Sequence, residues 1–207
     1  MKRDQKIKIV FLNCIKGFIV MVVVGILVFS VLIQNAKTEK SAEKMAHKFL
    51  VSLYDSSPDT LGYILPPLDE YSDSDENLKI YIKKLNQSIK NRFGNCYTEE
   101  FWNYMIGNRM WLTAPEAAQK RDCNINVKSV KFNKINTEEN GIHFNFVVEM
   151  EMEMDIDQDQ NSDVIQLSET LAEPIIQKGE VWLVFEGFSY KISQLTYSDN
   201  QLVQYTY

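Results

Sequence analysis

The stretch that decides the fold is residues 142–154, IHFNFVVEMEMEM. Every even position from 142 to 156 is apolar, and every odd position from 143 to 157 except Val147 is polar or charged. Successive side chains of a β-strand point to opposite faces, so this alternation predicts one long strand with a buried face and a wet face. Its length predicts a bent strand that wraps around a core.

Shorter runs on both sides of this stretch share its period of two. Before it, the alternation changes phase near Lys128 and Ser129, which predicts a β-bulge there. Asn140-Gly141 is a turn signal between this run and the long strand. After the long strand, a turn at residues 186–187 separates two further strands, which are predicted from six apolar residues: Val181, Leu183, Phe185, Phe188, Tyr190 and Ile192.

Two segments beyond the long strand lack so clear a period. Residues 158–177 are polar and predict a long loop, part of which could be a strand. Residues 201–207 predict an additional edge strand.

Before residue 120 the apolar spacing is helical instead. The clearest stripe predicts an amphipathic helix over residues 38–54. Ser57-Pro58 predicts the start of a short helix, and Gly94 the end of the next, whose apolar stripe runs from residue 78 to 89. Thr98 followed by two glutamates predicts the start of a third. About three helices before about four strands indicate an α+β fold, with the helices on one face of a curved antiparallel sheet.

Residues 17–33, GFIVMVVVGILVFSVLI, contain no charged residue. At about 1.5 Å per residue the run is about 26 Å long, close to the thickness of a hydrocarbon core. It predicts one transmembrane helix, and the excess of bases before it places the N-terminus inside the cell. Two alternatives stay open, a cleaved signal peptide and a buried helix of a soluble protein, but no convincing cleavage site follows the run.

These patterns divide the chain into three parts. We expect a cytoplasmic basic tail at 1–16, a transmembrane helix with a short linker at 17–36, and an extracytoplasmic cone-like α+β domain at 37–207. The expected location is therefore the cell membrane, with a single span and the C-terminal domain outside the cytoplasm.

Charge limits the partners of the outer domain. The first sixteen residues hold five bases and one acid, whereas the rest of the chain holds 17 bases and 27 acids, a net charge of −10. An acidic domain repels phosphates, so direct binding of nucleic acid is not expected.

The cysteines allow two interpretations. Cys96 and Cys123 could form a disulfide in an oxidising compartment, or they could be two reduced, half-buried thiols. No cluster of cysteines and histidines indicates zinc, and we predict no metal site and no cofactor.

Candidate functional residues are few. His47 lies beside the apolar stripe of the first amphipathic helix and His143 on the wet face of the long strand, and neither has a catalytic partner at motif spacing, so no catalytic residue is assigned. The run Asp155, Asp157 and Asp159 starts like a calcium loop but lacks its glycine and its final glutamate. Two further sets are candidates: an acidic interaction surface of Glu149, Glu151, Glu153 and Asp155, and a pocket lining of Trp102, Trp111, Trp182 and Tyr190.

The arrangement of residues 38–198 resembles the nuclear transport factor 2-like (cystatin-like cone) superfamily. The resemblance rests on the helices AEKMAHKFLVSLY and TEEFWNYMIGNRM, on CNINVKSVKF, on the long strand, and on the hairpin GEVWLVFEGFSYKI. With its basic tail and single expected span, the chain also resembles the bitopic assembly subunits of type IV secretion and conjugation systems. That resemblance implies a non-enzymatic scaffold that contacts other membrane-complex subunits and can form homo-oligomers.

Three functions follow from these observations, and the interior of the cone separates them. A structural or assembly subunit needs exposed interaction surfaces. An anchored ligand-binding or sensing module needs a hollow cone, and an enzyme needs polar side chains converging inside it. A filled, apolar interior would disfavour the last two.

Overall fold

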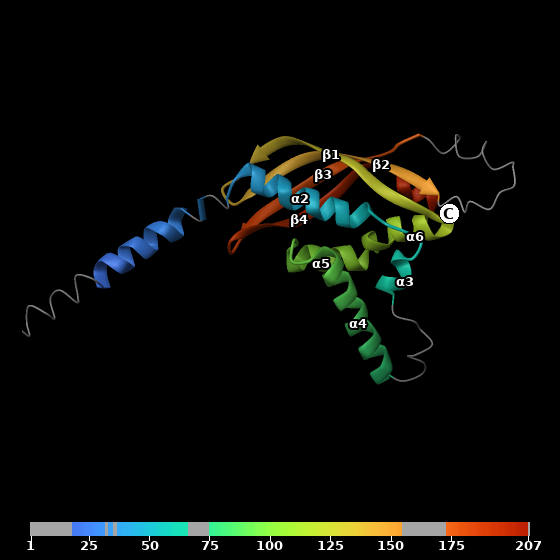
Figure 1. Cartoon of the computed structure of the whole chain (residues 1–207), viewed down its shortest axis with the longest axis horizontal. Helices are drawn as coiled ribbons and strands as arrows, with labels where there is room; N and C mark the ends of the chain where they lie inside the picture. Colours follow the sequence, from blue (N-terminus) through green and yellow to red (C-terminus); the bar gives the residue numbers. More distant parts are fainter. Residues whose placement is uncertain (1–17, 32, 35–36, 66–74, 155–172, 207) are drawn as a thin grey trace, which may run out of the picture.

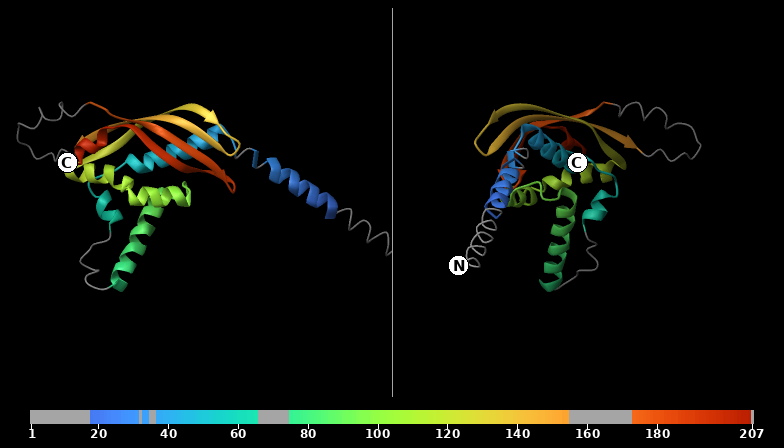
Figure 2. Two further views of the ribbon diagram at one scale, coloured as in Figure 1. Left: turned by 180° about the vertical axis from the view of Figure 1, so that it is seen from behind. Right: turned by 60° about the vertical axis from the view of Figure 1, so that its left-hand side comes forward.

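The structure is a computed structural model, and it describes residues 18–31, 33–34, 37–65, 75–154 and 173–206. Its body is an α+β arrangement in which helices cover one face of a four-stranded antiparallel sheet (Figure 1). The strands follow one another in the order β1-β2-β3-β4. Figure 2 shows from two further sides that the sheet is curved and that its other face carries none of the described helices.

The sheet is a meander of long strands. They are β1 (Cys123–Thr137), β2 (Gly141–Met154), β3 (Ile175–Glu186) and β4 (Ser189–Asn200). The pairing of β1 with β2 shifts register between Val127 and Ser129, which confirms the predicted bulge. Strand β3 begins before Val181, the first strand residue predicted after the loop, since Ile175 and Gln177 are buried within it.

Helix α2 (Glu39–Tyr54) lies against the sheet. Its N-terminus is capped by the Thr38 side chain, which accepts a hydrogen bond from the backbone N–H of Ser41. Lys134 of β1 pairs with Glu39 at 2.6 Å and holds the same end of the helix to the sheet. The helix predicted over residues 38–54 is therefore confirmed within one residue.

The remaining helices form a second group on the same side. They are α3 (Thr60–Ile64), α4 (Asp75–Phe93), α5 (Glu99–Gly107), the 3-10 helix η2 (Met110–Leu112), α6 (Thr113–Arg121) and the 3-10 helix η3 (Gln201–Tyr205). Gly94 has a φ of +66° after α4, and the Thr98 side chain caps α5, both as predicted. The expectation of about three helices was too low, because η2 and α6 lie where no helix was expected. The predicted edge strand at 201–207 is wrong, since residues 201–205 form η3.

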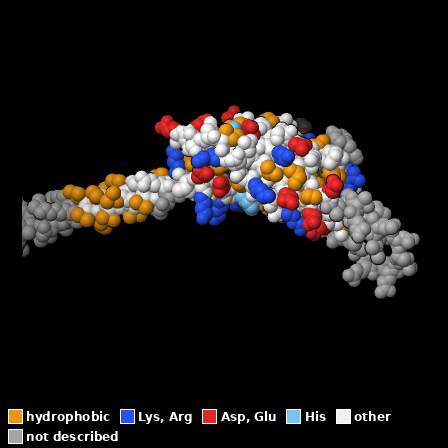
Figure 3. All heavy atoms as spheres, turned by 90° about the horizontal axis from the view of Figure 1, so that it is seen from above, with side chains coloured by type: hydrophobic (Ala, Val, Ile, Leu, Met, Phe, Trp, Pro, Cys, Tyr) orange, Lys and Arg blue, Asp and Glu red, His pale blue; other side chains and the backbone are white. Residues whose placement is uncertain are grey.

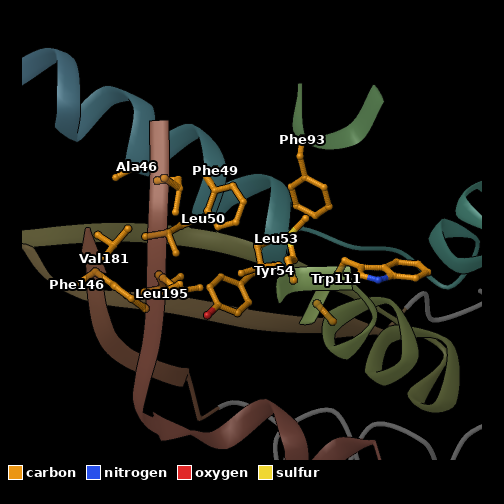
Figure 4. Packing of buried hydrophobic residues seen from close by; sticks show 14 of the residues in the cluster. Ala46, Phe49, Leu50, Leu53, Tyr54, Phe93, Trp111, Phe146, Val181 and Leu195 are labelled. Carbon is orange, nitrogen blue, oxygen red and sulfur yellow. The ribbon is translucent and has the colours of Figure 1, made fainter. Parts of the chain in front are cut away.

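The core fills the space between α2 and the sheet. Figure 4 shows α2 side chains directed toward Phe146, Val181 and Leu195 of the sheet. Phe49 is fully buried and packs edge-on against Phe101, with ring centroids 5.7 Å apart. Among the described residues, the buried polar or charged ones are Ser56 and Gln177 alone. Apolar burial is therefore the main stabilising term that joins the two layers.

The expected transmembrane helix and the expected membrane location are not supported. Across the described ranges, no helix is both long and apolar enough to cross a membrane. The apolar side chains of the described helical residues 18–31 are exposed (Figure 3), and Phe29 packs edge-on against Phe188 of the β3–β4 turn.

Gly179 provides a test of the packing within the sheet. A Cβ added at this position in β3 would lie 2.0 Å from the Thr196 carbonyl oxygen and 2.7 Å from Cζ of Phe146. Backbone and a fully packed ring cannot move aside cheaply, so Gly179→Ala should lower the free energy of unfolding by about 3 kcal/mol in urea denaturation.

The matched control is Gly107→Ala at the end of α5, where an added Cβ meets nothing within 4 Å. It should change the free energy of unfolding by less than about 1 kcal/mol. Equal effects of the two substitutions would contradict the close approach of Phe146 to β3.

Candidate functional site

The acidic surface predicted on the long strand lies on the face of the sheet that no described helix covers. Glu149, Glu151 and Glu153 alternate along β2 on this face. Lys128, in the bulge of β1, reaches Glu151 at 2.5 Å and Glu153 at 3.1 Å, and Ser129 donates a hydrogen bond to Glu149. The carboxylates therefore have partners within their own sheet. Asp155 lies outside the described residues.

The four aromatic residues predicted to line one pocket do not converge. Trp102 stacks on Tyr97 with centroids 4.8 Å apart, and Trp111 is buried in η2. Tyr190 is buried on the helix side of β4. Trp182 alternates with the buried Val181 and Leu183 of β3 and therefore points to the uncovered face.

On that uncovered face, His143 and Trp182 form a cross-strand pair. They are directly opposite in the β2–β3 ladder, and their rings stack 3.9 Å apart at an angle of 20°. Nε2 of His143 lies 3.2 Å from a carboxylate oxygen of Glu180. His143 was predicted on the wet face of the strand, yet its side chain is only 12% exposed, because the indole covers it. His47, the other predicted candidate, is exposed on α2.

The interior contains a tyrosine pair that sequence patterns did not single out. Burial raises the pKa of Tyr54 well above its usual value, and burial raises the pKa of Tyr197 to about 12. A tyrosine that acts as a base or nucleophile needs a lowered pKa, so both shifts oppose that chemistry. The two hydroxyls influence each other's pKa, so they lie close together, with Tyr54 buried in the core and Tyr197 half-buried against it.

The two described cysteines are buried free thiols. Burial raises the pKa of Cys96 and of Cys123, which lowers their thiolate fractions at neutral pH. Of the two interpretations that the sequence allowed, the structure agrees with two reduced thiols and not with a disulfide. In the described ranges no group of three or more His, Cys, Asp or Glu residues could hold a metal ion, and Asp157 and Asp159 lie outside them.

Two depressions lie on the described surface, and neither is between α2 and the sheet. The first, of about 240 Å³, separates α5 from β4: Phe101 and Leu195 form its floor, and Glu100, Tyr104 and Thr196 are among its lining residues. The second, of about 630 Å³, lies along the outer side of α2 and is lined by Ser41, Lys44, Met45, His47, Lys48, Val51 and Ser52.

Comparison with known proteins adds little. No protein-family model and no curated protein matches the chain. One similar solved structure is an IcmL-like type IV secretion system protein from Legionella pneumophila subsp. pneumophila str. Philadelphia 1, with 9% sequence identity, a TM-score of 0.40, and coverage of 79% of this chain and 94% of that chain. A TM-score this low establishes neither a shared fold nor a shared function. The cone superfamily assignment therefore stays a prediction.

The buried tyrosines predict how stability depends on pH. An unfolded tyrosine ionises near pH 10, whereas folding keeps Tyr54 and Tyr197 neutral to higher pH. Their contribution is complete below pH 10 and is lost as pH rises toward 12, because only the unfolded chain then gains ionisation free energy. We expect stability to fall by on the order of 2 kcal/mol over this interval in urea titrations.

The double variant Tyr54→Phe/Tyr197→Phe should reduce this alkaline loss, and part of it should remain because burial also raises the pKa of Tyr97 to about 12. Tyr63→Phe is the control, since Tyr63 is 81% exposed and should leave the pH profile unchanged. An unchanged profile in the double variant would contradict the burial of the two hydroxyls.

Proposed function

We propose that this chain is a non-enzymatic structural subunit that acts through contacts with other proteins. In its finer form, the proposal assigns it to the assembly of a conjugative transfer or type IV secretion apparatus. The alternative to it is a ligand-binding or sensing module that uses the interior of the cone.

The observation that carries the proposal is the filled interior. Phe49, Leu50 and Leu53 of α2 are each at most 1% exposed and occupy the space where a cone-shaped ligand pocket would lie. Ligand sites combine an open cavity with a few convergent polar groups. The depressions along α2 and beside α5 are instead at the surface. The interior therefore favours neither the ligand-binding alternative nor an enzyme.

The assignment to a secretion or transfer apparatus does not depend on the filled interior and has less support than the structural role. It rests on the order of elements in residues 38–198, where capped helices precede a meander of long strands, as in the cone domains that the sequence resembles. The described residues keep this order of elements, and none of their helices is long and apolar enough to cross a membrane. The proposal therefore concerns the folded body and its protein contacts.

The test is to express the full-length chain with an affinity tag from its own locus and to measure the mass of the particle that contains it. The proposal predicts a defined complex of several named subunits that co-elute in fixed ratio, and loss of transfer or secretion when the gene is deleted. Elution as a monomer at native abundance, with transfer and secretion unaffected by the deletion, would overturn it.

A further inference from the structure

The apolar helix at 18–31 leaves the body at the end of the sheet where both hairpin tips lie (Figures 1 and 2). One tip is the β1–β2 turn at 138–140, and the other is the β3–β4 turn at 187–188. The two tips are joined, because the backbone N–H of Phe185 donates a hydrogen bond to the carbonyl oxygen of Asn140 at 2.7 Å. A segment that contacts both tips is therefore held against one connected surface.

Lys37 makes the central contact with these tips. Its ammonium donates hydrogen bonds to the carbonyl oxygen of Glu139 at 2.5 Å and to Oδ1 of Asn140 at 3.1 Å. The same ammonium lies over the Phe185 ring, 5.9 Å from its centroid, where a cation is attracted to the aromatic face. Hydrogen bonds from a charged donor are stronger than those between neutral groups. One side chain thus connects the β1–β2 turn with the end of β3.

Two further contacts lie on either side of Lys37 along the chain. Before it, Phe29 packs edge-on against Phe188 with ring centroids 5.5 Å apart. After it, Glu39 pairs with Lys134 of β1 at 2.6 Å. Each contact is weak alone, because Phe188 stays 63% exposed and surface ion pairs contribute little. Together they hold the chain at three separated points, and a segment held in this way cannot pivot about any one of them.

We propose that these contacts form a joint that fixes the direction in which the helix at 18–31 leaves the body. The joint consists of Phe29, Lys37 and Glu39 on one side and of Lys134 and the two hairpin tips on the other. Its consequence is mechanical, because a displacement of the helix then moves both tips and the strands that they connect. In an assembly, every copy presents the helix at the same angle. This last use rests on the proposed function, whereas the joint belongs to the single chain.

The test measures the distance between helix and body in the full-length chain by pulsed electron–electron double resonance. Spin labels are carried by non-natural amino acids at Met21, which is 72% exposed, and at Asn133, which is exposed on β1. Dilution with unlabelled chain removes distances between copies, and a mild detergent keeps the exposed apolar helix from aggregating. The joint predicts one narrow distribution of distances.

The double variant Lys37→Met/Phe188→Ser removes contacts to both tips and should widen this distribution by about twofold or more, because the helix can then pivot. The matched control is Lys40→Met/Tyr63→Ser. It removes an exposed lysine one turn further along and a ring that is 81% exposed, neither of which belongs to the joint, and it should leave the width unchanged. Circular dichroism checks that both variants keep their fold.

The outcomes separate the joint from the proposed function. A broad distribution in the unaltered chain would overturn the joint, and so would a narrow one that Lys37→Met/Phe188→Ser leaves unchanged. Either result leaves the proposed function standing, because other subunits can bind the folded body whatever the direction of the helix. A narrow distribution that the double variant widens supports the joint, even in a chain that forms no complex and so fails the test of the proposed function.

Discussion

The packing of α2 on the sheet is the constraint on which the rest of the structure depends. Small residues at 42 and 46 let the helix approach closely, and Phe49, Leu50 and Leu53 then fill the space beneath it. Within the sheet itself, the strands leave room only for a glycine at 179, where the Phe146 ring lies against the β3 backbone. Since close-packed interiors leave few voids, the contact that stabilises the fold also removes the pocket that a cone-shaped domain would otherwise offer.

Much of this framework could be predicted from local sequence because its signals are local. The α2 stripe, the Thr98 cap, the left-handed Gly94 and the phase change near Lys128 each depend on a few adjacent residues. Helix α6 was missed because TAPEAAQKR contains no large apolar residue that would mark a stripe, although its alanines are buried. The start of β3 at Ile175 was not predicted, because a polar residue such as Gln177, which is buried here, is more typical of a loop.

The positions of the candidate functional residues depend on how strands pair and how helices pack in three dimensions, and a single sequence does not show either. Trp182 was predicted to line an interior pocket. In β3 it lies between the buried Val181 and Leu183, so its side chain points to the uncovered face, where it pairs across the strands with His143. The apolar stripe of α4 was recognised, but spacing alone cannot say that its first two turns extend beyond the body. The apolar run near the N-terminus likewise predicted a span that the described helices do not contain.

The proposed function requires a dry, filled space between α2 and the sheet, and xenon binding measures this most directly. Xenon occupies apolar cavities that are too hydrophobic for water. Crystals of the protein under xenon pressure should show no xenon between α2 and the sheet, while crystals of Phe49→Ala, in which the cavity is deliberately opened, should show it there. Xenon at this position in the unaltered protein would contradict a filled interior and would make the space between α2 and the sheet a candidate ligand site again.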